Sequence, residues 1–487
     1  MADYLHGAYG EINSVGNRVA DAAAGVIVYV GTAPVHQVAG GKNNVNKPIV
    51  VNNIAEAKKY FGYSEDWAAY TLCEAMHVHF ELKGVGPIVL INVLDPAKHK
   101  ETSGGTASKT AVNGVITIPE AEKIVLDTVK VGTKVAGTDY TIAYDFNKKC
   151  IVISEIVPGA LGTSALSISY DIVKPSEVGT GDVVGATDGL GNNTGVYAVK
   201  DVYPVTGLVP SFLVCPGFSS VPAVHTAMYA NSNKVNGHWD VYMLADLPIV
   251  NEGQAVTLAT AATFKATNNY THENETVYYP LAKGSDGQTY HLSVLAAANL
   301  QGLLAEQGGI PFRSPSNTEC AIIENLYFGE ENIGCVIDDS IINERLNKFG
   351  IASAAYVGGR WVIWGAHSAD YTQATATEIN VAETNRMMLN YISNDFQVRR
   401  TADVDQPLTV NDIRSIVSEE QARLDALVNV GALTYGTVVL NADADTRSDI
   451  VKGDYTFAFT ITTTPLAKSL TAIVNWSNEG FTTYFEE

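Results

Sequence analysis

The sequence predicts an α/β protein: a discontinuous α/β core domain with an inserted all-β module, followed by an α+β C-terminal domain, with an extended arm at each chain end. Apolar runs of strand length alternate with amphipathic helical patterns over residues 25–98 and again over 200–335. Between them, residues 99–199 are rich in Thr, Val and Gly and carry short β-like runs. The 487 residues suffice for about three domains.

The first core segment is typical of a βαβ unit. GVIVYVGTAP (25–34) is a continuous apolar run, which indicates a strand buried on both faces. The pattern then predicts a short helix over 53–62 and a longer one over 64–84, with Ser64 as the N-cap of the second. PIVLINVL (87–94) is a second buried strand.

Local patterns also predict the elements of the insert and of the second core segment. DYTIAYDFNKKCIVIS predicts a hairpin about residues 145–149, and the insert leaves through a Gly-rich loop, 177–195. Beyond it the core pattern resumes, with strands expected at 211–217 and 239–248 and helices expected at 221–235 and 291–309.

The last third of the chain predicts a separate domain and an arm. Residues 336–453 alternate strands with two amphipathic helices, near 383–396 and 411–430. Residues 454–487 alternate β-branched, aromatic and small residues, with β-rich segments expected at 454–465 and 469–478, and predict a strand-forming arm. Residues 1–24 contain several glycines and no period long enough to fold alone, so they predict an extended arm.

The composition excludes several classes of protein. With 31 basic and 52 acidic residues the net charge is −21, and this field would repel a phosphate backbone, so we expect no nucleic-acid binding. No apolar run approaches the roughly 20 residues of a membrane span, and the N-terminus lacks the features of a signal peptide. The five cysteines form no CxxC pair, which argues against a disulfide framework or a cysteine zinc site. We expect a protein made and folded in a reducing cytoplasm.

The stretch GGRWVIWGAHSADY (358–371) contains the residue types of a hydrolase triad, His367, Ser368 and Asp370, within four positions. A nucleophilic serine normally stands on a strained turn between small residues, whereas Ser368 directly follows His367. Neighbours on a strand point to opposite faces, so these two side chains would not hydrogen-bond. We interpret the stretch as a strand with polar residues at its end.

Three further patterns fail on spacing. GGK at 40–42 resembles the end of a phosphate loop, but the residues around it do not complete the motif. The glycines of 189–195 resemble a dinucleotide fingerprint only loosely, because no strand leads into them. His77 and His79 lie two apart on a helix, about 200° around its axis, and cannot chelate one metal together. We therefore expect no catalytic, cofactor-binding or metal site.

The run IINERLNKFGIASAAYVGGRWVIWGAHSADY (341–371), followed by EINVAETNRMMLNYI (378–392), resembles the C-terminal domain of contractile tail sheath proteins. The residues that carry this resemblance are Asn343, Gly358, Gly359, Val362, Trp364, Gly365, Ala366, Asn380 and Val381. The chain departs from the family at His367 and Ser368, where the family usually has Arg and Thr, and at Ala382 and Glu383, where Arg-Arg is common.

Other parts of the chain are also similar to this family. FLVCPGF (212–218) and YMLADLP (242–248) resemble its α/β core strands, and MADYLHGAYGEI (1–12) with VIVYVGTAP (26–34) resembles its N-terminus. The similarity covers most of the chain except the β module, where the family varies. The ordered set of motifs carries the resemblance, rather than any single one.

The resemblance implies a structural subunit, not an enzyme, that polymerises around a tail tube and contracts to drive the tube through the bacterial envelope. It implies a helical homo-oligomer of stacked hexameric rings, with the tail tube protein and the baseplate and tail terminator proteins as partners, in a virion tail assembled in the host cytoplasm. A phage-tail-like bacteriocin or injection system would use the same subunit. The alternative of a different class is a cytoplasmic α/β enzyme with a β insert.

The resemblance also implies roles for particular residues. Strand exchange between subunits would use the two arms, with Tyr4, Leu5, Tyr9, Ile12, Tyr455, Phe457, Phe459, Ile461, Ile473 and Trp476. Helix 411–431 would face the tube, or else be an ordinary surface helix; we expect it to bury its apolar side and expose Arg414, Glu419, Glu420, Arg423 and Asp425. The core of the C-terminal domain would include Trp361, Trp364 and Gly365. The β module, 99–199, would lie on the outside of the assembly.

Overall fold

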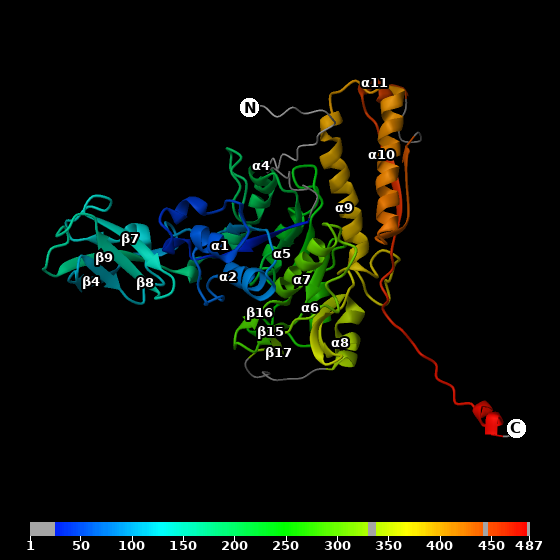
Figure 1. The fold of residues 1–487 in the computed structure, drawn as a ribbon, viewed down its shortest axis with the longest axis horizontal. Coiled ribbons are helices and arrows are strands. Elements are labelled where there is room, and N and C mark those ends of the chain that lie inside the picture. The colour runs from blue at the N-terminus through cyan, green and yellow to red at the C-terminus, as the bar shows by residue number, and fades with distance from the viewer. Residues whose placement is uncertain (1–24, 330–337, 442–446, 485–487) are drawn as a thin grey trace, which may run out of the picture. The chain divides into compact units, whose positions relative to one another are not determined.

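The computed structural model describes residues 25–329, 338–441 and 447–484 (Figure 1). The chain divides into two compact units, Met1–Pro407 and Leu408–Glu487. The larger unit contains the main sheet and the all-β module, and the smaller one contains a long helix and a two-stranded sheet. The architecture is therefore mixed α/β, with several separate sheets.

An eight-stranded sheet forms the centre of the larger unit. Its strand order is β19-β18-β14-β11-β10-β1-β3-β2. The six inner strands are parallel, and β2 and β19 lie antiparallel at the two edges. The strands are β1 Val26–Gly31, β2 Ile49–Val51, β3 Ile88–Asn92, β10 Pro210–Val214, β11 Tyr242–Asp246, β14 Glu275–Tyr278, β18 Ile351–Val357 and β19 Arg360–Trp364.

Helices cover both faces of this sheet. They are α1 Ile54–Phe61, α2 Thr71–Met76, α3 Thr180–Val184, α4 Val202–Thr206, α5 Pro222–Ala230, α6 Ala261–Thr267, α7 Leu292–Glu306, α8 Asp339–Arg345 and α9 Glu383–Arg400. Ile27 and Tyr29 belong to the core shared with α1, α2 and α7, whereas Val28 and Leu213 belong to the core shared with α3, α4 and α5. Because parallel strands are buried on both faces, each reads as a continuous apolar run.

The predicted helix over 64–84 begins later than expected. It starts as α2 at Thr71 and continues as a π-helical segment, η3 His77–Lys83. Ser64 is therefore not its N-cap. The start is fixed by the end of β1, because the Thr32 hydroxyl accepts a hydrogen bond from Thr71 N (3.1 Å) and the Thr71 hydroxyl accepts one from Thr32 N (3.3 Å). A tertiary contact thus overrides the local capping pattern.

The β module is a sandwich of two three-stranded sheets, β4-β9-β6 and β5-β8-β7. Its strands are β4 Lys100–Lys109, β5 Val115–Ile118, β6 Lys130–Val131, β7 Tyr140–Asp145, β8 Cys150–Glu155 and β9 Leu166–Val173. Ile116 and Ile153 from one sheet pack with Ile168 from the other. The predicted hairpin is present, with Asp145 paired to Cys150.

Two segments pack differently from the divisions that the sequence suggested. Residues of 178–199, expected in the inserted module, belong to the core on the second face of the main sheet, through Val183, Val196 and Val199. Strands β18 and β19, expected in a separate C-terminal domain, complete the main sheet instead. The buried valines of the first segment and the apolar residues of β18 and β19 are covered at this sheet.

Short strands and the smaller unit complete the fold. In the larger unit β12 Val250–Asn251 pairs with β13 Gln254–Ala255, and a small sheet contains β15 Leu281–Gly284, β16 Thr289–Tyr290 and β17 Ile323–Tyr327. The smaller unit contains α10 Val410–Asn429, β20 Leu433–Leu440, α11 Arg447–Lys452 and β21 Phe457–Thr463. β20 and β21 form an antiparallel pair, and α10 packs on β20.

Replacing Thr71 with Val should lower the free energy of unfolding by about 1–3 kcal/mol, because the buried N–H of Thr32 would lose its acceptor. Urea denaturation of the full chain measures the change. The control is Thr117→Val, at an exposed position of β5, which should change stability by less than about 0.5 kcal/mol. Equal effects of the two substitutions would contradict the proposed anchoring of α2.

Candidate functional site

The carboxyl edge of the main sheet is where open α/β folds bind ligands, at the point where the strand order reverses. Here that point lies between the neighbouring strands β1 and β10. In the sheet, β3 lies on the other side of β1, and β11 lies on the other side of β10, so the chain runs outward in opposite directions from these two strands. Thr71 fills it. A Cβ on Gly31 would lie 2.4 Å from the Thr71 hydroxyl, and one on Gly217 would lie 2.9 Å from its methyl group. The two glycines therefore make room for a side chain of the protein itself.

The next part of this edge is filled by an internal polar cluster. Asp246, at the end of β11, accepts hydrogen bonds from the backbone N–H of Ser293 (3.0 Å) and from its hydroxyl (2.5 Å) at the start of α7. The buried carboxylate of Glu74 accepts from the backbone N–H and from Nδ1 of His291, both at 2.6 Å. The N-terminus of α7, which could bind an anionic ligand, is thus occupied by two carboxylates of the chain.

The charges in this cluster shift the pKa of His291. Burial lowers the pKa of its imidazole, but the carboxylates of Glu74 and Asp246 outweigh that effect and raise it from 6.5 to about 9. Burial raises the pKa of Asp246, although His291 and Ser293 act against it. His291 is therefore an imidazolium at neutral pH, and the cluster is a partly buried ion pair that joins α2 to the start of α7.

The stretch with triad residue types does not have triad geometry. The Ser368 hydroxyl donates to Asp370 Oδ1 at 2.6 Å, and Asn380 Nδ2 donates to the other oxygen of this carboxylate at 3.2 Å. The ring of His367 stacks on Tyr371 at 3.6 Å. In a triad the histidine would accept the serine proton and the carboxylate would orient the histidine. Here the serine and the carboxylate bond to each other in a closed turn.

The two histidines and the glycine of the rejected metal and phosphate-loop patterns have hydrogen-bond partners within the protein. His77 Nδ1 lies 2.6 Å from Glu81 Oε2, and His79 Nε2 lies 2.7 Å from the Tyr29 hydroxyl. Backbone N–H of Gly40 donates to the carboxylate of Asp127 in the β module. Among the described residues, no group of three or more His, Cys, Asp or Glu side chains is placed to hold a metal ion. Within those same residues, no helix is long and apolar enough to cross a bilayer.

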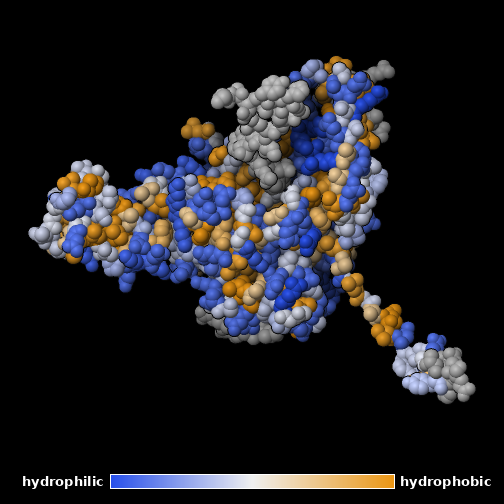
Figure 2. Space-filling view, viewed as in Figure 1, coloured by the Kyte–Doolittle hydropathy of each residue, from blue (hydrophilic) through white to orange (hydrophobic). Residues whose placement is uncertain are grey.

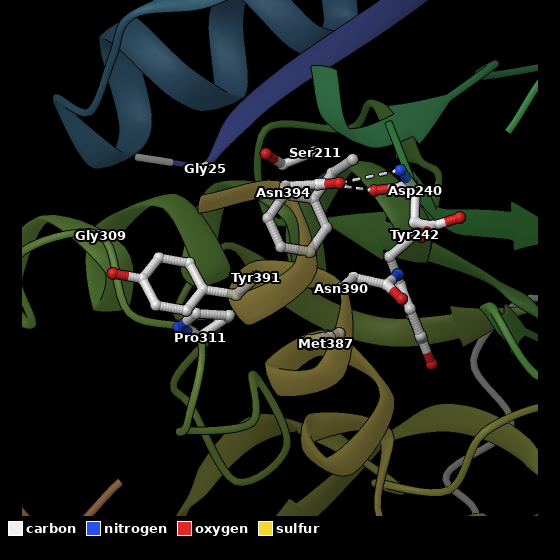
Figure 3. A pocket seen from close by; sticks show the side chains of 11 residues that line it. Gly25, Ser211, Asp240, Tyr242, Gly309, Pro311, Met387, Asn390, Tyr391 and Asn394 are labelled. Carbon is white, nitrogen blue, oxygen red and sulfur yellow. Dashed lines mark hydrogen bonds between the residues drawn. The ribbon is translucent and has the colours of Figure 1, made fainter. Parts of the chain in front are cut away.

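A small cavity lies at the opposite, amino edge of the main sheet, beside α9 (Figure 3). Asn394 holds α9 there, because its side chain accepts from the N–H of Asp240 (3.0 Å) and donates to its C=O (2.8 Å). Asn390 and Tyr391 also line the cavity. Its volume of about 20 Å³ holds a water molecule rather than a metabolite, for which pockets of about 300 Å³ or more are usual.

The smaller unit offers a different kind of site, a sheet of only two strands among the described residues. Leu433–Leu440 pairs with Phe457–Thr463 in antiparallel register, with Gly436 opposite Ile461 and Val438 opposite Phe459. A two-stranded sheet is marginally stable alone and presents backbone groups at its edges. This geometry suits the addition of further strands.

Helix α10 begins with a capping box, because Thr409 and Asp412 exchange hydrogen bonds between side chain and backbone. Of the residues expected on its exposed side, Arg414, Glu419 and Asp425 are exposed and Arg423 is partly so. The expectation is wrong for Glu420, which is buried. Positions four apart share a helix face, so Glu420 lies on the same side as the buried Ile416 and Leu424.

Sequence reasoning missed Gln421, because a glutamine in the middle of a helix is ordinarily solvated. Its Nε2 donates to the C=O of Gly436 (3.0 Å) and to Asp425 Oδ1 (2.9 Å). Its Oε1 accepts from the N–H of Val438 (3.1 Å). The side chain of α10 thus bonds to the backbone of β20. A Cβ on Gly436 would lie 3.1 Å from Leu424, so the glycine allows this close approach.

The C-terminal segment beyond β21 runs as an extended trace that carries a gathering of hydrophobic residues (Figures 1 and 2). Leu470, Ile473, Val474 and Trp476 are 81–91% exposed. The expected β-rich segment 469–478 contains no strand in the structure. A strand requires a hydrogen-bonding partner, and within the described part of this chain the segment has none.

The remaining arm and core residues are distributed as follows. Tyr4, Leu5, Tyr9 and Ile12 lie outside the described residues. Phe457, Phe459 and Ile461 belong to β21 and pair with β20 of their own chain, and Tyr455 precedes β21. Trp361 is buried on β19, and Trp364 Nε1 donates to Asn343 Oδ1 at 2.9 Å. Gly365 has a φ of 122°, and a Cβ there would meet Asn347.

Four cysteines, Cys73, Cys150, Cys215 and Cys320, are buried as free thiols. Burial raises the pKa of the Cys73 thiol to about 12 and holds those of Cys215 and Cys320 above their usual range. Cys335 lies outside the described residues. These four thiols are structural side chains of the cores.

Comparison with known proteins confirms the resemblance to contractile tail sheath proteins. No family model matches the chain. It is 26% identical over 492 residues to the tail sheath protein of Burkholderia phage BcepMu, with 96% of each chain covered. The fold is similar to that of a chain in the contracted sheath complex of an extracellular contractile injection system, PVC, with a TM-score of 0.58, 12% identity and 99% of each chain covered. It is also similar to a chain in the baseplate of the anti-feeding prophage, with a TM-score of 0.56, 14% identity, and 98% of this chain and 100% of that chain covered.

The raised pKa of His291 predicts a pH-dependent contribution to stability. A group with a raised pKa stabilises the fold fully below its ordinary value of 6.5, and this contribution is lost as the pH rises through about 9. The free energy of unfolding of the wild type should therefore exceed that of His291→Gln by on the order of 2 kcal/mol at pH 6. This difference in stability should shrink by pH 9.5. Urea denaturation of both proteins at each pH measures it.

The difference between the two proteins isolates His291 from other titrating groups. Burial lowers the pKa of Lys265 to about 8, which changes stability with pH in the opposite direction, but equally in both proteins. A difference that stays constant between pH 6 and pH 9.5 would rule out the ionised His291–Glu74 pair.

Proposed function

We propose that this chain is the sheath subunit of a contractile tail or of a tail-like injection system. The observation that carries the proposal is similarity over nearly the whole chain, both in sequence to a phage tail sheath protein and in fold to chains of contractile systems. The subunit would form a helical homo-oligomer of stacked hexameric rings around a tail tube, in a tail assembled in the bacterial cytoplasm. Tube, baseplate and tail terminator proteins would be its partners.

A role in assembly, rather than catalysis, agrees with the site geometry. The carboxyl edge of the main sheet is filled by Thr71 and by the Asp246 and Glu74 clusters, so the place where an α/β enzyme would bind its substrate is closed. This disfavours the alternative of a cytoplasmic α/β enzyme. A phage tail and a bacteriocin or injection system remain equally compatible with this subunit, since relatives of both kinds are similar to it.

The subunits would be linked by strand exchange. The two-stranded sheet of the smaller unit would receive strands from neighbouring copies. The tail from Leu470 to Trp476 is long enough for a strand and exposes apolar side chains that such pairing would cover. Residues 1–24 would form the second donor arm. Because backbone hydrogen bonds persist while domains rotate as rigid bodies, these links would hold the sheath together during contraction.

Helix α10 would face the tube through its exposed charged side. Arg414 and Glu419 are exposed there, whereas Glu420 is buried and would not take part. The β module would lie on the outside of the assembly, as the resemblance to sheath proteins implies. Contraction would use the free-energy difference between two packings of the same subunits, summed over many copies.

Deleting residues 465–487 should leave a soluble, folded chain that no longer forms tubes. The melting temperature should stay within about 2 °C of the full chain, because the removed tail is exposed. Electron microscopy and sedimentation of the purified proteins measure assembly. Ile473→Asp should have the same effect, and its matched control Ser477→Asp in the same tail should assemble normally. Tubes formed by the deletion variant would exclude the tail as a link.

Exchanging two charges on α10, Arg414→Glu with Glu419→Lys, should weaken binding to the tube protein about tenfold or more, because opposed charges across an interface become like charges. Co-sedimentation of the sheath chain with preformed tubes measures it. Lys148→Glu with Glu177→Lys, an exchange at exposed positions of the larger unit, is the control. If both double variants bind equally well, α10 is an ordinary surface helix.

A further inference from the structure

The β module, which runs from His99 to Lys174 in the structure, has two ends that differ in their contacts. A backbone hydrogen bond from Lys174 N to the C=O of His99 (2.9 Å) closes the module. At one end, Lys149 in the turn between β7 and β8 forms an ion pair with Glu65, outside the module (3.1 Å). Because β5 and β7 run antiparallel to β8, the opposite end holds the start of β5, the start of β7 and the end of β8. We call this opposite end the distal end.

Backbone hydrogen bonds hold the parts of the distal end together. It consists of three segments, 110–115, 135–138 and 156–165. Glu155 N, at the end of β8, donates to the C=O of Gly114 in the first segment (2.9 Å). The next amide, Ile156 N, donates to the C=O of Asp139, which adjoins the second segment (2.9 Å). The three segments therefore lie side by side and form one surface.

Apolar side chains gather at the distal end and are exposed. Hydrophobic surface is visible on the β module in Figure 2. The apolar residues that are 36–70% exposed there come from all three segments and are Val112, Val115, Val135, Ile156 and Val157. Single exposed apolar side chains are common on protein surfaces, but a group of them on adjoining segments is typical of an interaction site.

The distal end also lacks charge. Its twenty residues include no Asp, Glu, Lys or Arg, whereas about 25–35% of a typical protein surface is charged. The two carboxylates that border it bind its backbone, because Asp139 Oδ2 accepts from Val135 N (2.7 Å) and Glu155 Oε2 accepts from Leu161 N (3.4 Å). Two lysines also border it, so the charges there balance. The whole module contains eight lysines and eight acidic residues, so the net charge of −21 lies outside it.

These features restrict the partner that the distal end accepts. A nucleic acid or an anionic membrane would find no cation within the three segments. A basic protein would be attracted to the acidic remainder of the chain rather than to a neutral apolar surface. A second copy of the module matches the distal end, because it is neutral and does not repel its like. In a polymer such a copy is always near, at a high effective concentration.

We propose that the distal end of the β module packs against the β module of a second copy of this chain. The contact buries the five apolar side chains, and the neutral modules meet although each chain carries a charge of −21. It goes beyond strand exchange, because it uses side chains of a different region. It relies on the proposed assembly only to bring two copies together. Left uncovered, the same patch on every copy would join separate particles to one another.

Photo-crosslinking of the assembled full chain tests this contact. Val157 is replaced by an amino acid that carries a benzophenone, the tubes are irradiated, and denaturing electrophoresis isolates the covalent dimer. Mass spectrometry then locates the link. We expect it to join position 157 to a residue between 99 and 174 of another copy. A probe at Val135, which is also exposed, repeats the test in case the first variant does not fold.

A charge placed in the patch provides the matched comparison. Val112→Asp, combined with the probe at 157, should reduce dimer linkage by about tenfold or more while tubes still form, because the contact would bury an unpaired carboxylate. The control is Thr263→Asp, at an exposed position of α6 outside the module, which should leave linkage within about twofold of the parent chain. Equal linkage in the two variants overturns the proposal, because the contact would then not depend on the apolar patch.

The outcomes separate this contact from the sheath assignment. Tubes without a covalent dimer overturn the contact and leave the sheath assignment intact. A link to another part of the second copy, or to a different co-purified protein, does the same. A link between two modules in chains that form no tubes supports the contact and removes the sheath assignment. Absence of both tubes and links removes the two together.

Discussion

Parallel strands must be covered on both faces, and most of the larger unit follows from that requirement. β1 presents Ile27 and Tyr29 to one helical layer and Val28 to the other, and its neighbours repeat the pattern. Segments that are distant in sequence are drawn to the sheet for the same reason. Residues of 178–199 leave the β module to cover one face, and β18 and β19 extend the sheet from the C-terminal part of the unit. The strands of this sheet and the segments that cover it therefore come from distant parts of the chain.

The carboxyl edge of the same sheet, where open α/β folds bind ligands, is filled by side chains of the protein itself. Thr71 stands between the ends of β1 and β10, and the carboxylates of Asp246 and Glu74 hold the start of α7. At the other edge, Asn394 ties α9 to the backbone of Asp240. These contacts join helices to strand ends through directional hydrogen bonds and an ion pair. The result is that both ends of the strands are closed by contacts within the chain.

The sequence predicted the elements whose burial is strongest. The apolar runs of β1 and β3 and the stripes of α9 and α10 are visible locally, because periodicity reflects burial directly. The start of α2 was missed because Thr32, far away in sequence, fixes it. Glu420 was expected on the exposed side, yet a charged residue at the spacing of Ile416 and Leu424 is buried with them.

Some features of the candidate site could likewise be predicted from the sequence, and others could not. The strand pattern predicted an arm in the tail, but residues 469–478 form no strand in the structure, so the role of the arm stays a prediction. The pairing of Phe457 and Phe459 with β20 of their own chain was missed, since strand pattern does not identify the partner strand. The role of Gln421 could not be predicted from the sequence, because it depends on where α10 places the side-chain amide relative to β20.

The four buried thiols bear on the durability of an assembled particle. Oxidation of cysteine begins from the thiolate, and burial keeps Cys73, Cys215 and Cys320 protonated at any physiological pH. A polymer contains every reactive group once per subunit, so one reactive thiol in the chain would be present in every copy along the polymer. Burial of these thiols therefore protects each of those positions, in every copy, from forming cross-links or sulfenic acids in an oxidising solution.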